Sequence, residues 1–140
     1  MKSAALIATT VALLLPCAAH AAACDALKSA TYAGIMRGQF DAYPNAFAGS
    51  SLTFDAAGVG SGRGVIGYDP ASTAAVQSPY AGVTCSSTDA TSGLLNFGPS
   101  LGSNSFTVFD DGSRIWVRHE IPGRPIAGWL FRLPPAPRSR

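Results

Sequence analysis

Few side chains in this sequence could carry out chemistry, and their positions limit what that chemistry could be. The chain has two histidines and three cysteines. His20 and Cys17 lie in an N-terminal segment that we expect to be removed, so His119, Cys24 and Cys85 remain. A structural zinc site takes about four Cys or His ligands, which these residues cannot supply once the cysteines pair. We therefore predict no metal site and no cofactor.

The acidic residues give no stronger catalytic signal. Six of the Asp residues fall in predicted loops, where Asp is common for conformational reasons, and no carboxylate pair stands out for glycoside hydrolysis. The adjacent Asp110 and Asp111 fall short of a calcium-loop pattern. His119-Glu120, beside a Pro122-Gly123 turn, is expected to be a solvated surface pair. A serine–histidine–acid arrangement stays open, because its members need not be close in sequence. We assign no catalytic residue.

The first 22 residues have the features of a secretory signal peptide. A short positive start, Met1-Lys2, precedes an apolar run at residues 4–15 and a small-residue cleavage site near residues 19–23. The apolar run is shorter than the ~20 residues that a membrane span requires. We therefore predict no transmembrane segment and an exported protein, periplasmic or extracellular.

The two remaining cysteines predict one disulfide. Cys24 and Cys85 form an even pair in an exported chain, and their bridge would close a long loop. A second interpretation is a lipid anchor, because Ala21-Ala22-Ala23-Cys24 resembles a bacterial lipoprotein cleavage box with Cys24 as the acylated residue. That box lacks the usual Leu at its first position, so we favour the disulfide.

Length and composition indicate one β-rich domain. Removing residues 1–22 leaves 118 residues (140 minus 22), enough for a single core. The charged fraction is only 13%, and 15 Gly and 10 Pro are present, which argues for a turn-rich β fold rather than a helical bundle. We predict a β-barrel domain over residues 23–133, followed by a disordered Pro- and Arg-rich tail at 134–140.

The clearest strand pattern lies at residues 104–133. Phe106 and Val108 alternate with polar residues, and Asp110-Asp111-Gly112-Ser113 then predicts a tight turn. A second alternating strand and a Pro122-Gly123 type II turn follow, before a last strand with large side chains on both faces. We expect that last strand to be central or to close a barrel, since an apolar edge strand would invite aggregation.

The upstream half repeats this pattern more weakly. Loops are expected at residues 41–48, which carry Tyr43 and Phe47, and at residues 69–79. Strands are expected at residues 32–40, 51–54, 58–68, 80–86 and 93–97.

Glycine falls on every second residue from 58 to 64, so one face of the strand there has no side chains. We expect an aromatic residue from a neighbouring strand, such as Trp116 or Trp129, to cover that face. A ligand or partner approaching the bare backbone is the alternative.

About eight strands linked by hairpins, with no helical period between them, predict an all-β antiparallel fold. We favour a small up-and-down barrel, because hairpins give a meander and closure removes both edges; a β-sandwich is the alternative. The layout resembles lipocalin-like barrels in architecture alone. The Gly-x-Trp of a lipocalin first strand is absent, since Gly34-Ile35-Met36 stands where it would be sought, and we assign no family.

Charge is distributed unevenly along the chain. Three basic residues against seven Asp give a net charge of −4 over residues 23–111, and six Arg against one Glu give +5 over residues 112–140. Arg114, Trp116 and Arg118 share one strand face, where guanidinium groups could stack on the indole. If this face points outward it would form an interaction surface; if it points inward, Trp116 belongs to the core.

These observations leave two main function classes open. The first is a non-catalytic binding or inhibitory module that presents the Arg/Trp face, with Tyr43, Phe47 and the loops, to a protein or to an anionic component of the envelope. The second is a carrier of a small apolar ligand inside the barrel, with aromatic lining drawn from Phe54, Tyr68, Phe97, Phe106 and Trp129. A hydrolase is the least favoured class. Nucleic acid is not expected as a partner, because export removes the usual target and lysines are scarce.

Overall fold

The computed structural model of this chain describes residues 22–40, 43–68, 76–99, 101–119, 122–123 and 125–135. The cleavage and tail predictions lie largely outside these residues. Two short 3-10 helices are present, η1 (Ala23–Leu27) and η2 (Asp110–Gly112). The strands are β1 (Thr31–Phe40), β2 (Tyr43–Phe54), β3 (Gly60–Tyr68), β4 (Val76–Ser87), β5 (Ser92–Asn96), β6 (Ser103–Phe109), β7 (Arg114–His119) and β8 (Ile126–Arg132).

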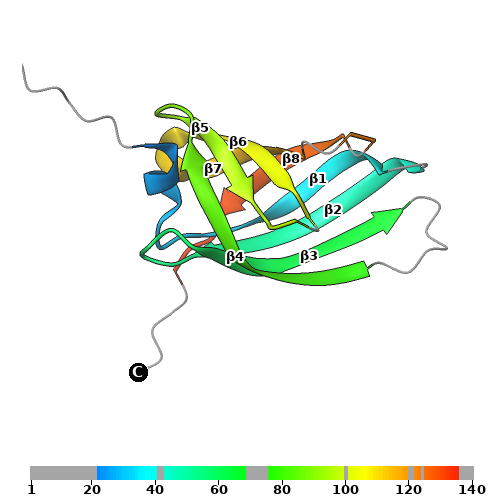
Figure 1. Ribbon diagram of the computed structural model, residues 1–140, viewed down its shortest axis with the longest axis horizontal. Coiled ribbons are helices and arrows are strands. Elements are labelled where there is room, and N and C mark those ends of the chain that lie inside the picture. The colour runs from blue at the N-terminus through cyan, green and yellow to red at the C-terminus, as the bar shows by residue number, and fades with distance from the viewer. Residues whose placement is uncertain are drawn as a thin grey trace, which may run out of the picture.

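The eight strands form a closed antiparallel meander barrel (Figure 1). Each strand pairs with the next along the chain, and β8 pairs back with β1 from Tyr32↔Arg132 to Gly38↔Ile126. The prediction of an up-and-down barrel is confirmed over the β-sandwich. The last strand closes the barrel, which explains why it tolerates large side chains on both faces.

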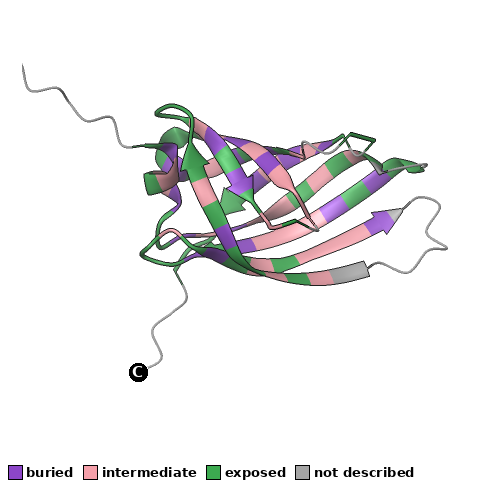
Figure 2. Cartoon of the chain, in the orientation of Figure 1, coloured by how far each residue is buried: buried purple, intermediate pink, exposed green. Residues whose placement is uncertain are grey.

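Alternation along the strands decides which side chains point inward (Figure 2). On β7, Ile115 and Val117 are buried, while Trp116 and Arg118 are exposed. β8 follows the same rule, with Ile126 and Leu130 inside the barrel. Each large apolar side chain that is fully buried in this way stabilises the fold by about 1.5–3 kcal/mol.

One end of the barrel is closed by η1 and η2. Leu27 of η1 is fully buried, and the Tyr32 hydroxyl donates a hydrogen bond of 2.7 Å to the Gly112 carbonyl oxygen of η2. A disulfide joins Cys24 of η1 to Cys85 of β4, as predicted. We call η1 and η2 together the plug. Next to the plug, inside the barrel, lies a dense core formed by Leu27, Tyr32, Leu52, Phe54, Val83, Leu95, Phe106, Ile115, Val117 and Leu130.

The two predicted loops are partly wrong. β2 begins at Tyr43, so most of the expected loop at 41–48 is strand, and residues 76–79 belong to β4. Both stretches contain a proline, which lowered their predicted strand character. Pro44 lies at the beginning of β2, before its pairing with β3 starts at Ala46. A proline is tolerated in a strand where no neighbouring strand pairs with it.

The row of glycines on β3 points into the barrel and is covered by aromatic rings, as expected, but the rings are not Trp116 or Trp129. A Cβ atom at Gly60 would lie 3.0 Å from the Phe54 ring, and one at Gly62 would lie 3.0 Å from the Tyr80 ring. Trp116 and Trp129 stand on the outside of the barrel, because alternation places Ile115, Val117 and Leu130 inside.

Candidate functional site

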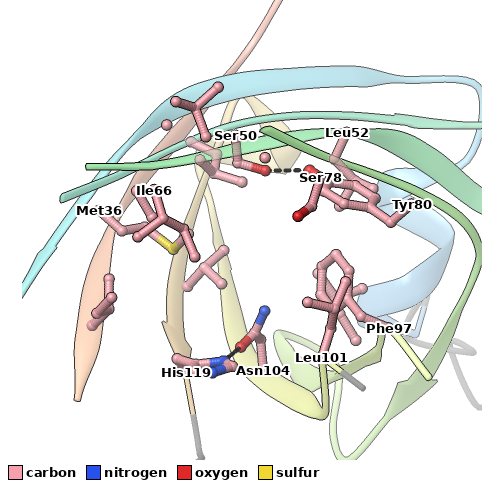
Figure 3. A pocket seen from close by; sticks show the side chains of 18 residues that line it. Met36, Ser50, Leu52, Ile66, Ser78, Tyr80, Phe97, Leu101, Asn104 and His119 are labelled. Atoms are coloured by element: carbon pink, nitrogen blue, oxygen red, sulfur yellow. Dashed lines mark hydrogen bonds between the residues drawn. The ribbon is translucent and has the colours of Figure 1, made fainter. Parts of the chain in front are cut away.

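The half of the barrel away from η1 contains a partly open cavity of about 130 Å³. Its wall includes residues from all eight strands and from the β5–β6 connection, and most of them are apolar or glycine. Leu52, Leu95 and Leu130 separate it from the dense core beneath the plug. The polar side chains at the wall are Ser50, Ser78, Tyr80, Asn104 and His119 (Figure 3).

The sheet opens beside this cavity. β4 pairs with β3 from Val76 onward, but its pairing with β5 begins only at Thr84. β5 has five residues, so among the described residues the first part of β4 faces the β5–β6 connection without a paired strand. Figure 3 shows Ser78 and Tyr80 on one side of the cavity, and Phe97 and Leu101 on the other. Side chains rather than paired backbone therefore close the barrel wall here.

Tyr80 is fixed at this wall by its hydroxyl group. The hydroxyl lies 2.5 Å from Ser50 Oγ and 2.8 Å from the Ser51 carbonyl oxygen. Its ring meets the Phe97 ring edge to face, with 5.1 Å between centroids. Burial raises the pKa of the Tyr80 hydroxyl, although the hydrogen bond to Ser50 opposes this shift. Tyr80 therefore presents its ring to the cavity, while its polar end is occupied by the wall.

Asn104 is the one buried polar side chain among the described residues, at 8% exposure. Its Oδ1 atom is hydrogen-bonded to His119 Nδ1. An amide oxygen can only accept a hydrogen bond, so this contact requires a proton on His119 Nδ1. Figure 3 shows the Asn104 nitrogen pointing into the cavity, and this atom is not among the fully buried polar atoms that lack a partner.

The strands explain why this polar pair faces inward. Asn104 lies on the same face of β6 as Phe106, and His119 lies on the same face of β7 as Val117. The two residues are direct cross-strand partners. The prediction that His119 belongs to a solvated surface pair is therefore wrong for His119, which is half-buried and lines the cavity. The i, i+2, i+4 series Ile115, Val117, His119 was the sequence signal for this position.

The Arg/Trp face points outward. Arg114, Trp116 and Arg118 lie on the outer surface of β7, and Trp116 is 36% exposed. We call the apolar surface around it the aromatic face, and define it by Ile35, Phe109, Trp116, Trp129 and Phe131. Ile35 and Phe131 are its most exposed members, at 57% and 52%.

The rings of the aromatic face contact one another directly. Trp129 meets both Trp116 and Phe109 edge to face, with 5.1 Å between ring centroids in each case. The Arg114 guanidinium carbon lies 5.0 Å from the Trp129 ring centroid, within the range of a cation–π interaction. Arg114 Nε also lies 2.7 Å from Asp110 Oδ2. We expected the arginines to stack on Trp116, whereas Arg114 lies over the Trp129 ring instead.

The barrel wall carries arginines and no acidic residue. None of the eight strands contains Asp or Glu. The Asp residues that the structure describes lie in η1, in η2 and in the turns at the same end of the barrel. The arginines of the strands are Arg37, Arg63, Arg114, Arg118 and Arg132.

The other predicted binding residues do not form a single site. Tyr43 and Phe47 are exposed on β2, where the Phe47 ring lies over Gly67. Of the five aromatic residues suggested as cavity lining, Phe97 lines the cavity, whereas Phe54 and Phe106 belong to the dense core. Trp129 is on the outer surface, and the Tyr68 side chain lies outside the described residues.

The connection between β5 and β6 contains a motif that was not among the predicted site residues. Gly98-Pro99-Ser100-Leu101-Gly102 matches the letters of the Gly-x-Ser-x-Gly nucleophile elbow. That elbow places its serine on a turn between a strand and a helix, whereas these residues connect the antiparallel strands β5 and β6. Ser100 lies outside the described residues, so the match supports no catalytic assignment.

Within the described residues, no group of His, Cys, Asp and Glu side chains is arranged to hold a metal ion. No helix in this part of the chain has the length and hydropathy that crossing a bilayer requires. No protein-family model, curated protein or solved structure matches the chain. Its function must therefore be argued from the geometry of the barrel.

Proposed function

We propose that this protein binds one small, largely apolar molecule inside its barrel. The observation that supports this function is the cavity of about 130 Å³ in the half of the barrel opposite the plug. Protein interiors are normally packed without voids of this size. An apolar cavity of about 150 Å³ is large enough to bind benzene, so this cavity has room for a ring of about six or seven heavy atoms.

The gap between β4 and β5 supplies a route for that ligand. Backbone pairing closes the barrel elsewhere around its circumference, so opening another part of the wall would break hydrogen bonds between strands. At the gap, rotation of Phe97 and Leu101 would be sufficient. The end of the barrel that η1 and η2 cover is held closed by the hydrogen bond from Tyr32 to Gly112 and by the disulfide.

Filling the cavity tests this proposal. Ala48 is buried and lines the cavity, so Ala48→Leu would occupy the space with three additional carbon atoms. We expect binding of benzene or cyclohexane probes, measured by NMR titration, to be lost while the thermal midpoint is kept or raised. The matched control is Ala81→Leu, at an exposed position of β4, which should bind as the wild type does. Unchanged probe binding in the Ala48→Leu protein would overturn the proposal.

We further propose that the protein is exported and loses residues 1–22. The Cys24–Cys85 disulfide supports an oxidising compartment. It also opposes the lipid-anchor interpretation, because acylation of Cys24 would use the same sulfur atom. Native mass spectrometry of the protein recovered from its own cell, followed by denaturation with and without reduction, measures the cleavage site, the disulfide and any bound ligand together. An acylated Cys24 would contradict this proposal.

A second binding function is favoured by the aromatic face. We propose that this face docks on an anionic phospholipid surface. Trp and Phe rings partition into the membrane interface, and basic residues near them are attracted to anionic lipids. Arg114 and Arg118 on β7 and Arg37 on β1 surround the rings, and none of the strands contains an acidic residue. Asp110 of η2 pairs with Arg114 and offsets part of this positive charge.

The same charges argue against a second copy of the chain as the occupant. Packing two aromatic faces together would bring Arg114, Arg118 and Arg37 close to their own copies. Asp110 already pairs with Arg114, and the strands contain no further carboxylate, so this contact would place like charges close together in a desolvated interface.

Vesicle co-sedimentation tests the docking proposal. We expect binding to vesicles of phosphatidylglycerol and phosphatidylcholine, weakening as salt is added, and no binding to phosphatidylcholine alone. Trp116→Ala should reduce binding with little change in thermal midpoint, because Trp116 is outside the core. The matched control is Leu94→Ala, a substitution of similar exposure on the outer surface of β5. Dimerisation without vesicle binding, or capture by an acidic protein alone, would overturn the proposal.

A further inference from the structure

One of the polar side chains at the cavity wall points a donor group into the cavity. We propose that the side-chain amide nitrogen of Asn104 is the recognition point of the site, and that the ligand is a small, largely apolar ring bearing a hydrogen-bond acceptor, such as a cyclic ketone. This inference rests on the proposed cavity function and names the chemical class of its ligand.

The first step of the argument is the placement of Asn104. The side chain is more than nine-tenths buried, its Oδ1 atom is held by His119 Nδ1, and its nitrogen points into the cavity (Figure 3). With the oxygen bonded to His119, the side chain presents its N–H donors to the cavity.

The second step is the access to that nitrogen. Asn104 Nδ2 is not among the fully buried polar atoms that lack a hydrogen-bond partner, which fits an atom at the surface of the cavity. The Tyr80 hydroxyl, in contrast, is bonded to Ser50 Oγ and to the Ser51 carbonyl oxygen. A ligand that brings an acceptor to Asn104 Nδ2 would gain a hydrogen bond, and its apolar remainder would fill the rest of the cavity.

The third step limits the ligand. The cavity volume allows a ring of about six or seven heavy atoms. Most of the cavity wall is apolar, with Met36, Ile66 and Leu101 among the side chains labelled in Figure 3. The ligand is therefore largely apolar, and its acceptor group lies against Asn104. A donor group placed against Asn104 Nδ2 would be unfavourable, because both groups would carry hydrogens.

The test compares two probes of the same shape, cyclohexanone and methylenecyclohexane, which differ only in C=O against C=CH₂. We expect Asn104→Leu to weaken cyclohexanone binding about tenfold and to change methylenecyclohexane binding less than about threefold. Asn104→Asp keeps an oxygen toward His119 but removes the donor, and should lose the ketone to the same degree or more. Asn45→Leu and Asn45→Asp, at an exposed amide of β2, are the matched controls and should leave both affinities unchanged.

A measurement on the wild type keeps the inference testable if the variants do not fold. The side-chain NH₂ cross-peaks of Asn104 in a ¹H–¹⁵N spectrum should shift on addition of cyclohexanone and stay in place with methylenecyclohexane. If both probes bind and these peaks respond to neither, the role of Asn104 is wrong while the cavity function stands. If neither probe binds, or an ordered water alone occupies the site, the inference fails together with the cavity function.

Discussion

Two tyrosines, the buried Tyr32 and the half-buried Tyr80, show how a single hydroxyl group serves the fold. Tyr32 donates to the Gly112 carbonyl oxygen and joins β1 to the plug, whereas the Tyr80 hydroxyl is bonded to Ser50 and Ser51 on β2. Burial raises the pKa of both hydroxyl groups, opposed at Tyr32 by the charge of Arg132 and at Tyr80 by the bond to Ser50. Both side chains must therefore remain protonated in the folded protein.

This requirement predicts a loss of stability in alkali. In the unfolded chain these tyrosines ionise at a pKa of about 10, and in the folded barrel they ionise at higher pH. Above about pH 10 the unfolded state binds fewer protons, so the free energy of unfolding should fall as pH rises. Urea unfolding at several alkaline pH values measures this slope. Tyr32→Phe and Tyr80→Phe should each reduce it, and an unchanged slope in both variants would contradict the assignment.

Glycines on the barrel wall provide a second prediction at the scale of the residue. A Cβ atom at Gly62 would overlap the Ser51 carbonyl oxygen and press on the Tyr80 ring, whereas one at Gly49 would meet nothing within 4 Å. We expect Gly62→Ala to lower the free energy of unfolding by about 2–3 kcal/mol. Gly49→Ala should be neutral or stabilising by up to about 1 kcal/mol. Denaturant unfolding of both variants checks the difference, and equal effects would contradict it.

At the scale of the element, η1 is the part of the molecule that depends most on a covalent link. It has five residues, too few to be stable alone, and it is held by the disulfide, by a hydrogen bond from Cys24 N to Ser87 Oγ, and by burial of Leu27. Because Cys24 is bonded to Cys85 on β4, η1 is linked covalently to the fourth strand of the barrel.

Breaking this link should destabilise the protein strongly. The cysteines are separated by 61 positions, and chain-entropy models give about 4 kcal/mol for a loop of this size. We expect the Cys24→Ser/Cys85→Ser double variant to lose about this much free energy of unfolding in urea. Dithiothreitol should lower the stability of the wild type similarly and leave the double variant unaffected. If dithiothreitol lowered the free energy of unfolding of both proteins equally, its effect would not come from this disulfide.

At the scale of the whole molecule, the two proposed binding surfaces lie on opposite sides. In a closed barrel of eight strands, β4 and β8 are four strands apart in either direction. The gap beside β4 therefore faces away from the aromatic face, which is centred on β8. A protein docked through Trp116 and Trp129 would keep its cavity open to the solvent.

This arrangement predicts that the two binding events are independent. The affinity for cyclohexanone, measured by titration, should be the same with and without phosphatidylglycerol vesicles. The Trp116→Ala variant should bind the ketone as the wild type does, and the Ala48→Leu variant should bind vesicles normally. Competition between ketone and vesicles would show that lipid enters the cavity and would contradict the separation of the two sites.

Local patterns in the sequence determined the strands and their order. The alternation of Ile115 and Val117 with Trp116 and the turn at residues 110–113 depend on neighbours along the chain, so they predicted the last three strands and the meander. The pairing of Cys24 with Cys85 followed from counting cysteines in a chain with a signal peptide. The direction of the Arg/Trp face stayed open, because alternation shows which residues share a face but not which face is inside.

The tertiary structure alone decided the site. Closure of β8 onto β1 placed Trp116 and Trp129 outside, and cross-strand register brought Asn104 to His119. The covering of the β3 glycines by Tyr80, and the gap that leaves space beside it, depend on where β4 leaves β3 and joins β5. Contacts of this kind join residues far apart in the chain and are set by packing and register, which no local pattern encodes.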